Sequence, residues 1–502
     1  MKTQTNYFVI FWLINLAIAA SKIFFTLRPE INLFTEEAQY WLWSQNLAWH
    51  YYSKPPLIAV FNLISTSVFG INELGVRINA ILLGMGTSWI VYLFAEYLYK
   101  SPKIAFWSGI LVMAMPFWIL FSTFHVTDSE LTFFWGLSIY WFYRGIKENK
   151  SNWWALAGLS TGVGLMAKSN MILIIPVILF YLVVTRQWKM HRTNFLFMLG
   201  ISSIGIIPGF IWNWQNGFST YKHLAFLSGV AGESSGFDMT AWMWRFLEYA
   251  GGQLGMVSLF LLPVFFCSIR SLKTDRDKIS LYLVLPALLS WIGFAGLTFF
   301  TEVEANWPVF AYVTLPIFMS RWLSQQSPKW EKVRNWGVTL SFGLPLLLIF
   351  PNFNPALSSD TILEIEKKSL RRLVGYRPLA ERIYFLQDSL KVEEVLVFSE
   401  SYHLASELAF YLPGNPKTYT INLGARKNQF DLWEGLEKQV GIGKEGVFVS
   451  WNEESPGVAA TFERLIYEEK FTVGFRGDSL RCAKIQIWEN LIDYKSGNPD
   501  TY

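Results

Sequence analysis

The stretch that decides the fold is IAFWSGILVMAMPFWILF, which occupies residues 104–121 and contains no charged side chain. A helix of this length rises about 27 Å, close to the ~30 Å thickness of the hydrocarbon core of a bilayer. Over the whole chain of 502 residues, 52% are hydrophobic and 16% are charged, against about 25% charged residues in soluble proteins. This composition predicts a polytopic α-helical membrane protein and excludes an intrinsically disordered chain.

Ten further apolar stretches lie on either side of this one, so that we expect about eleven transmembrane helices. The ten are residues 7–27, 75–99, 129–145, 153–167, 170–186, 194–213, 242–268, 279–299, 305–321 and 335–351. The first ends in small residues, as a cleavable signal peptide would, but apolar character resumes beyond them. We therefore expect an uncleaved first helix.

The distribution of lysine and arginine predicts the orientation of these helices. With the N-terminus in the cytoplasm, the inside segments carry seventeen basic residues, whereas the outside segments carry four, Arg28, Lys54, Lys168 and Lys222. Basic residues concentrate in cytoplasmic loops. The bias predicts a plasma (inner) membrane protein whose C-terminus lies on the extracytoplasmic side.

Composition changes after Pro351, where the chain becomes polar. Runs typical of strands occur at 395–399 and 446–450, and runs typical of helices at 402–411 and 459–469. We therefore predict two domains: a transmembrane domain over 1–351, which includes a first outside loop at 28–74, and a soluble extracytoplasmic α/β domain over 352–502. Two cysteines exclude a disulfide scaffold, and a net charge of +4 argues against a nucleic-acid partner.

The first outside loop contains FTEEAQYWLWSQNLAWHYYSKPPLIAVF, residues 34–61. Thr35 is expected to cap a helix that carries Glu36 and Glu37 in its first turn. Its tryptophans, Trp41, Trp43 and Trp49, predict that this helix lies in the membrane interface. Two interpretations of these charged residues stay open. They take part in catalysis or binding, or they have ordinary structural roles. In the second case Glu36 and Glu37 are acids at a helix start, and Lys54 is an interfacial lysine.

Two more outside loops carry ionisable residues. In FSTFHVTDSELTFFW, Asp128 and Glu130 stand at the start of an apolar helix, and either Thr127 or Asp128 is an alternative N-cap. His125 is interpreted as an interfacial polar residue. Lys168 separates two apolar runs near membrane depth, where an ionisable residue is a functional hypothesis by default.

The acids and lysines of these loops all fall on one membrane face. A lysine can neutralise a lipid phosphate, and a carboxylate can take the proton of an attacking hydroxyl. This reasoning leaves an enzyme and a transporter of lipid-linked sugars both open. A third hypothesis makes 352–502 a binding module on a membrane anchor.

The loop motif EEAQYWLWSQNLAWHYYSKPPLIAVF resembles that of glycosyltransferase family 39, the protein O-mannosyltransferases and the aminoarabinose transferase of lipid A. The family pattern is an acidic pair, Ala-x-Tyr, then Tyr-x-x-x-Pro. The stretches HVTDSELTFFWGLSIYWFYR, GLSTGVGLMAKSNMILIIP, IPGFIWNWQNGFSTYKHL and EANWPVFAYVTLP are similar to further segments of the family. The resemblance covers about residues 30–320 and implies a GT-C fold.

The resemblance also implies roles for individual residues. Glu36 and Asp128 match the catalytic carboxylates, although Glu36 stands where the family has Asp. The matched substrate-binding positions are Glu37, Tyr40, Tyr52, Lys54, Pro55 and Lys168. The aminoarabinose transferase has Glu before its lysine, whereas this chain has Ser53, which argues against that sugar or acceptor.

The activity that the resemblance implies is transfer of a sugar from a polyprenyl-phosphate donor to an extracytoplasmic acceptor, with inversion at the anomeric carbon. The acceptor is expected to be lipid A or another glycolipid, a polysaccharide or a protein. The transporter or flippase remains the alternative. No cofactor is expected, and a divalent cation held by Glu36, Asp128 and Glu130 is the alternative to that expectation.

Overall fold

The structure is a computed structural model that describes residues 6–229, 238–275, 277–349, 368, 370–392, 395–422, 427–452, 456, 460–475 and 478–495. It divides into two compact units, each assembled from separate stretches of the chain. The first comprises Met1–Ile23, Lys54–Ile58 and Arg77–Phe350, and the second comprises Phe24–Ser53, Ala59–Val76 and Pro351–Tyr502. Most of the first outside loop, which we assigned to the transmembrane domain, thus packs within the second unit.

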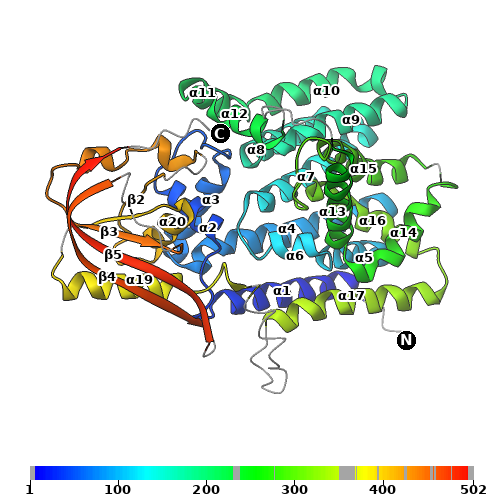
Figure 1. Ribbon diagram of the computed structural model, residues 1–502. Coiled ribbons are helices and arrows are strands. Elements are labelled where there is room, and N and C mark those ends of the chain that lie inside the picture. Colours follow the sequence, from blue (N-terminus) through cyan, green and yellow to red (C-terminus); the bar gives the residue numbers. More distant parts are fainter. Residues whose placement is uncertain are drawn as a thin grey trace. The chain divides into compact units, whose positions relative to one another are not determined.

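The first unit is a bundle of helices (Figure 1). In chain order its helices are α1 (Tyr7–Thr26), α4 (Glu73–Tyr99), α5 (Pro102–Met113), α6 (Pro116–Phe121), α7 (Thr127–Glu148), α8 (Ser151–Ala167), η1 (Ser169–Leu173), α9 (Ile174–Val184), α10 (Trp188–Ser203), α11 (Ile207–Gln215), α12 (Ser219–Leu227), α13 (Met239–Val257), η2 (Leu259–Leu261), α14 (Leu262–Ser271), α15 (Lys278–Leu297), η3 (Val309–Thr314), α16 (Leu315–Leu323) and α17 (Pro328–Ile349). Each of the eleven predicted apolar stretches coincides with one to three of these helices.

Several predicted spans are broken rather than straight. The stretch 104–121 divides into α5 and α6, because Pro116 cannot continue a helix and instead begins a new one. Among the described residues, α1, α4 and α15 are each long and apolar enough to cross a bilayer. The number of candidate spans rises to five if each of two bent helix pairs is one span. These pairs are α10 with α11, bent by 45°, and α13 with the 259–271 segment, bent by 78°. The membrane class is therefore confirmed, whereas the count of eleven spans stays a prediction.

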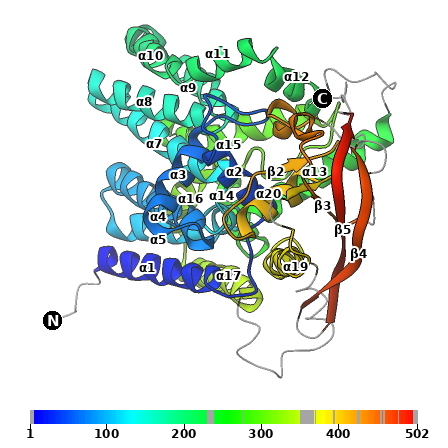
Figure 2. The same ribbon diagram turned by 90° about the vertical axis from the view of Figure 1, so that its left-hand side faces the viewer.

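The second unit contains a five-stranded mixed sheet of order β2-β1-β3-β5-β4. Its strands are β1 (Leu396–Ser399), β2 (Thr418–Thr420), β3 (Gly446–Ser450), β4 (Ala460–Phe475) and β5 (Asp478–Tyr494). Strands β2, β1 and β3 are parallel, and β5 and β4 form a long antiparallel ribbon that Figure 2 shows along one edge. Apolar residues of α19 (Tyr376–Ser389) and α20 (Tyr402–Tyr411) form one core with the strands they cover. The predicted α/β character of the C-terminal part is thus confirmed.

One predicted helix in this unit is wrong. The stretch 459–469 falls largely on β4, which pairs with β5 over its whole length. Phe462 at 9% exposure packs on Phe398 with ring centroids 5.6 Å apart, and the two charged residues after it, Glu463 and Arg464, are exposed. The pairing of β4 with β5 decides the conformation of this stretch. A local sequence pattern does not reveal such pairing.

The first outside loop forms two helices of this part of the fold, α2 (Thr35–Ser44) and α3 (Leu57–Phe69). Helix α2 packs against α20, and the ring of Trp41 lies 4.9 Å from that of Phe410. Trp43 stacks on Tyr51 at 4.4 Å. The prediction that Trp41 and Trp43 lie in the membrane interface is wrong, because both are 1% exposed within this unit. Only Trp49 of the three is exposed, at 66%.

His50 makes this loop sensitive to acid. Burial lowers the pKa of His50 from 6.5 to about 4, although its Nδ1 lies 2.6 Å from the carbonyl oxygen of Tyr51. As the pH falls, His50 is therefore protonated at a higher pH in the unfolded chain than in the folded chain. The stability gained from neutral His50 is lost as pH falls from 6.5 towards 4. We expect the free energy of unfolding to drop by about 2 kcal/mol between pH 7 and pH 5.

Thermal unfolding of the purified protein in lipid nanodiscs at the two pH values measures this effect. The variant His50→Gln should lose most of the pH dependence. An equal fall of the unfolding temperature in wild type and His50→Gln would assign the effect to other groups.

Candidate functional site

A buried ion pair joins two of the predicted site residues in the first unit. Lys168 Nζ lies 2.8 Å from both Oδ1 and Oδ2 of Asp128. The two residues are 8% and 4% exposed. Burial of such a pair is costly unless geometry and hydrogen bonds compensate. The contact of one ammonium group with both carboxylate oxygens provides part of that compensation.

The ends of two helices position this pair. Asp128 lies in the first turn of α7, and Lys168 follows the last residue of α8, where the backbone becomes extended. The expected N-cap at Thr127 or Asp128 is wrong, because Val126 occupies the N-cap position and both residues are helical. The Asp128 carboxylate is thus directed to Lys168 rather than to its own helix.

A second buried pair, His125 and Glu130, lies on the same helix start. His125 Nε2 is 2.9 Å from Glu130 Oε1, and both side chains are 0% exposed. Our interpretation of His125 as an interfacial residue is therefore wrong. Their spacing of five residues is no helical signature, so sequence reasoning missed the pair.

Further polar contacts involve residues that are close to these two pairs in sequence. Lys22 Nζ donates to Ser122 Oγ and lies 4.0 Å from the centroid of the Trp118 ring. Asn170, two residues after Lys168, donates from Nδ2 to the carbonyl oxygen of Trp307 at 3.2 Å. Polar groups at the ends of α1, α6, α7 and α8 and in the segment before η3 are thus paired within this unit.

The predicted carboxylates of the first loop stand on α2, in the second unit. Glu37 is 0% exposed and accepts the N–H of Phe34 at 2.8 Å, so that it caps its own helix. Thr35 is the first helical residue and not the expected cap, and its hydroxyl donates to Glu36 Oε2 at 2.9 Å. Glu36 is half-buried. Of the two acids, Glu37 therefore caps the helix, whereas Glu36 is the more exposed.

Of the remaining predicted residues, Tyr40 lies in α2, whereas Tyr52, Lys54 and Pro55 lie shortly before α3. Tyr40 and Tyr52 are buried in the second unit, where the N–H of Tyr52 donates to Gln429 Oε1 at 2.6 Å. Lys54 and Pro55 belong to the first unit, and Lys54 is half-buried whereas Pro55 is buried.

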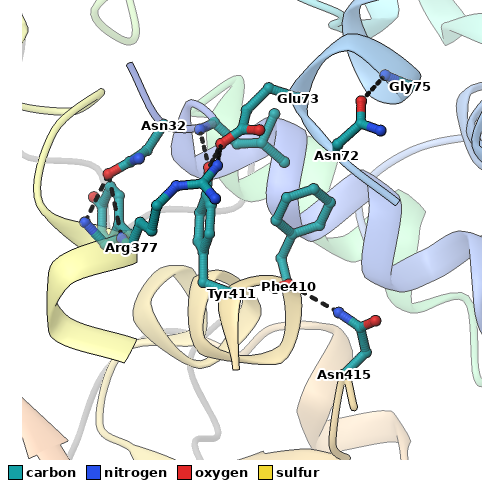
Figure 3. A network of polar contacts seen from close by, with 10 residues as sticks. Asn32, Asn72, Glu73, Gly75, Arg377, Phe410, Tyr411 and Asn415 are labelled. Atoms are coloured by element: carbon teal, nitrogen blue, oxygen red, sulfur yellow. Dashed lines mark hydrogen bonds and ion pairs between the residues drawn. The ribbon is translucent and has the colours of Figure 1, made fainter. Parts of the chain in front are cut away.

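A network of hydrogen bonds ties the first-loop residues to the C-terminal part of the second unit (Figure 3). The Tyr411 hydroxyl accepts the N–H of Leu33 at 2.7 Å and donates to Glu73 Oε1 at 2.8 Å. Arg377 forms an ion pair with the same Glu73 oxygen, and the N–H of Tyr376 donates to Asn32 Oδ1 at 2.8 Å. The segments on either side of α2 are therefore fixed by the residues that follow 370.

This network makes the stability of α2 depend on one hydroxyl group. Tyr411→Phe leaves the Leu33 amide and the Glu73 carboxylate each short of a partner, at a cost of about 1–3 kcal/mol. Tyr402→Phe is the matched control on the same helix, since the Tyr402 hydroxyl forms no hydrogen bond with any residue that the structure describes. We expect Tyr411→Phe to lower the unfolding temperature and increase hydrogen exchange across 32–44. Equal exchange in the two variants would contradict the role of the network.

The structure also bears on the alternative of a divalent cation. Asp128 is paired with Lys168 and Glu130 with His125. Within the described ranges, no group of three or more histidine, cysteine or acidic side chains is placed to hold a metal ion.

Comparison with known proteins places this geometry in context. The family described as dolichyl-phosphate-mannose-protein mannosyltransferase matches residues 53–212, a range that contains both Asp128 and Lys168. The chain is 28% identical over 331 residues to the lipid A galacturonosyltransferase RgtD of Rhizobium johnstonii, covering 64% of this chain and 67% of that protein. It is 28% identical over 132 residues to the undecaprenyl phosphate-alpha-4-amino-4-deoxy-L-arabinose arabinosyl transferase of Wigglesworthia glossinidia brevipalpis, of which it spans only 24%.

The fold has close counterparts among solved structures. The crystal structure of ArnT from Cupriavidus metallidurans bound to undecaprenyl phosphate superposes with a TM-score of 0.67. Identity is 14%, and the match covers 96% of this chain and 98% of that one. The apo oligosaccharyltransferase of Archaeoglobus fulgidus gives a TM-score of 0.52 at 10% identity, over 89% and 70% of the two chains. The predicted GT-C fold is confirmed.

Proposed function

Because the chain is a membrane glycosyltransferase of the GT-C type, similar to glycosyltransferase family 39, we propose that it transfers a sugar from a polyprenyl-phosphate donor to an acceptor lipid. The reaction takes place at the extracytoplasmic face of the plasma membrane, where the C-terminal part also lies. The observation that carries this proposal is the buried Asp128–Lys168 pair, which lies inside the range matched by the mannosyltransferase family.

Lys168 and Lys54 are assigned to the donor phosphate. When the sugar–phosphate bond breaks, negative charge grows on the leaving phosphate, and a preorganised cation stabilises it. Asp128 holds Lys168 in place through both carboxylate oxygens, so that the ammonium group has a fixed position before the donor arrives. Asp128 acts as the positioning residue of this pair.

Glu36 is assigned as the general base. It removes the proton of the acceptor hydroxyl as the hydroxyl oxygen attacks the anomeric carbon, and the polyprenyl phosphate departs with the electron pair of the broken bond. A single displacement inverts the anomeric configuration. Glu37, Tyr40, Tyr52 and Pro55 keep α2 and the following turn in position around this carboxylate.

A transfer assay with purified protein tests the proposal. The donor is a polyprenyl-phosphate sugar fraction from the source membranes, and the acceptor is lipid A, on which the galacturonosyltransferase relative is named as acting. We expect an acceptor product heavier by one sugar residue, with inverted anomeric configuration. Movement of intact donor across a vesicle bilayer without any such product would indicate a transporter instead.

A further inference from the structure

The turn that precedes α19 exposes three positive charges. Lys368, Arg371 and Arg372 are all exposed, and the stretch 368–378 contains no acidic residue. The apolar side chain of Leu370 in the same turn is buried. We refer to Lys368, Arg371 and Arg372 as the basic turn.

The three side chains of the basic turn have no carboxylate partner among the described residues, unlike three other arginines of this unit. Arg377 is paired with Glu73 (Figure 3), and two further pairs are Arg382 with Glu469 at 2.7 Å and Arg464 with Glu489 at 2.8 Å. Three neighbouring cations that have no carboxylate partner in the described part of the chain repel one another and attract an anionic ligand. Guanidinium groups bind phosphate and carboxylate through two parallel hydrogen bonds.

Hydrogen bonds hold the backbone that directly follows the basic turn. The N–H of Asn32 donates to the carbonyl oxygen of Leu373 at 2.6 Å, and Arg481 Nη2 donates to that of Val374 at 2.8 Å. Arg481 itself lies over the Trp451 ring at 3.7 Å. The backbone that directly follows Arg372 is thus fixed, which lowers the entropy that a ligand of this arginine must overcome.

The basic turn also borders the helix that carries the proposed general base. The guanidinium carbon of Arg372 lies 5.9 Å from the centroid of the Phe34 ring. Phe34 is the N-cap of α2 and precedes Glu36 by two residues. An anion held by the basic turn therefore lies beside the start of α2.

We propose that Lys368, Arg371 and Arg372 form a binding site for the anionic headgroup of the acceptor lipid, with phosphate as the group they recognise. The assignment rests on the proposed function, because it makes this site the acceptor side of the same reaction. It gives the C-terminal part a role in selecting the acceptor, in addition to holding α2.

Binding of the full-length protein in detergent to lipid A in mixed micelles tests this site. The triple variant Lys368→Gln, Arg371→Gln, Arg372→Gln should bind lipid A about tenfold more weakly than wild type. Wild type should bind lipid A without its phosphates as weakly as the variant binds the intact lipid. The matched control Lys417→Gln, Lys438→Gln, Arg464→Gln removes three charges that are paired with glutamates of the same unit, and should bind like wild type.

Two results would overturn the proposal. One is equal affinity of wild type and the triple variant for lipid A. The other is equally tight wild-type binding to micelles of phosphatidylglycerol, which would make the basic turn a general anionic-lipid surface. Undecaprenyl phosphate binding, measured on the same samples, should not change in either variant. Its absence in wild type would count against the proposed function rather than against this site.

Discussion

Glu36→Gln is expected to slow sugar transfer by about 10²–10⁴, the range that general base catalysis supplies. The amide keeps the size of the side chain and can still accept from the Thr35 hydroxyl, 2.9 Å away in wild type. It cannot take the proton of the acceptor. The unfolding temperature and the KM for the donor should therefore stay close to wild-type values while kcat falls.

Glu304→Gln is the matched control for this variant, because Glu304 is an exposed carboxylate of the first unit. Its transfer rate should equal that of wild type. If Glu36→Gln retained transfer within tenfold of wild type, Glu36 would lose its assignment as the base.

The second large effect is expected at the buried pair, where stability and activity can be separated. Lys168→Met leaves the Asp128 carboxylate buried without its counter-charge, at a cost of about 3–5 kcal/mol. This variant should therefore lose both folded yield and transfer. Adding Asp128→Asn removes the uncompensated charge and should restore the yield.

The double variant should nevertheless transfer the sugar far more slowly than wild type, because Lys54 alone remains to stabilise the leaving phosphate. Folded yield in detergent and transfer per mole of folded protein give the two readouts. Full transfer by the double variant would show that the pair serves stability alone.

The fold class was predictable from the sequence because membrane spans are long and local. Each of the eleven apolar stretches coincides with helix, and the strands at 396–399 and 446–450 fall where the apolar runs placed them. The breaks within spans were harder to predict. Pro116 is a visible signal for one break, whereas the 78° bend after Val257 depends on tertiary packing.

Contacts between segments distant in sequence could not be predicted from local sequence patterns. Trp41 looks like an interfacial residue until its partner Phe410 is known, and β4 looks like a helix until β5 pairs with it. The same limit applies at the site. The sequence pointed to Asp128 and Lys168 one by one, but their contact joins the start of α7 to the end of α8, 40 residues apart.

The most direct test of the account is lipid mass spectrometry of cells that lack this protein. The strain is complemented with wild type, Glu36→Gln or Glu304→Gln. We predict that one polyprenyl-phosphate sugar accumulates in the uncomplemented strain and with Glu36→Gln, and that it disappears with wild type and Glu304→Gln. Equal clearance of that lipid by wild type and Glu36→Gln would contradict transfer through Glu36 and would favour transport of the intact lipid-linked sugar.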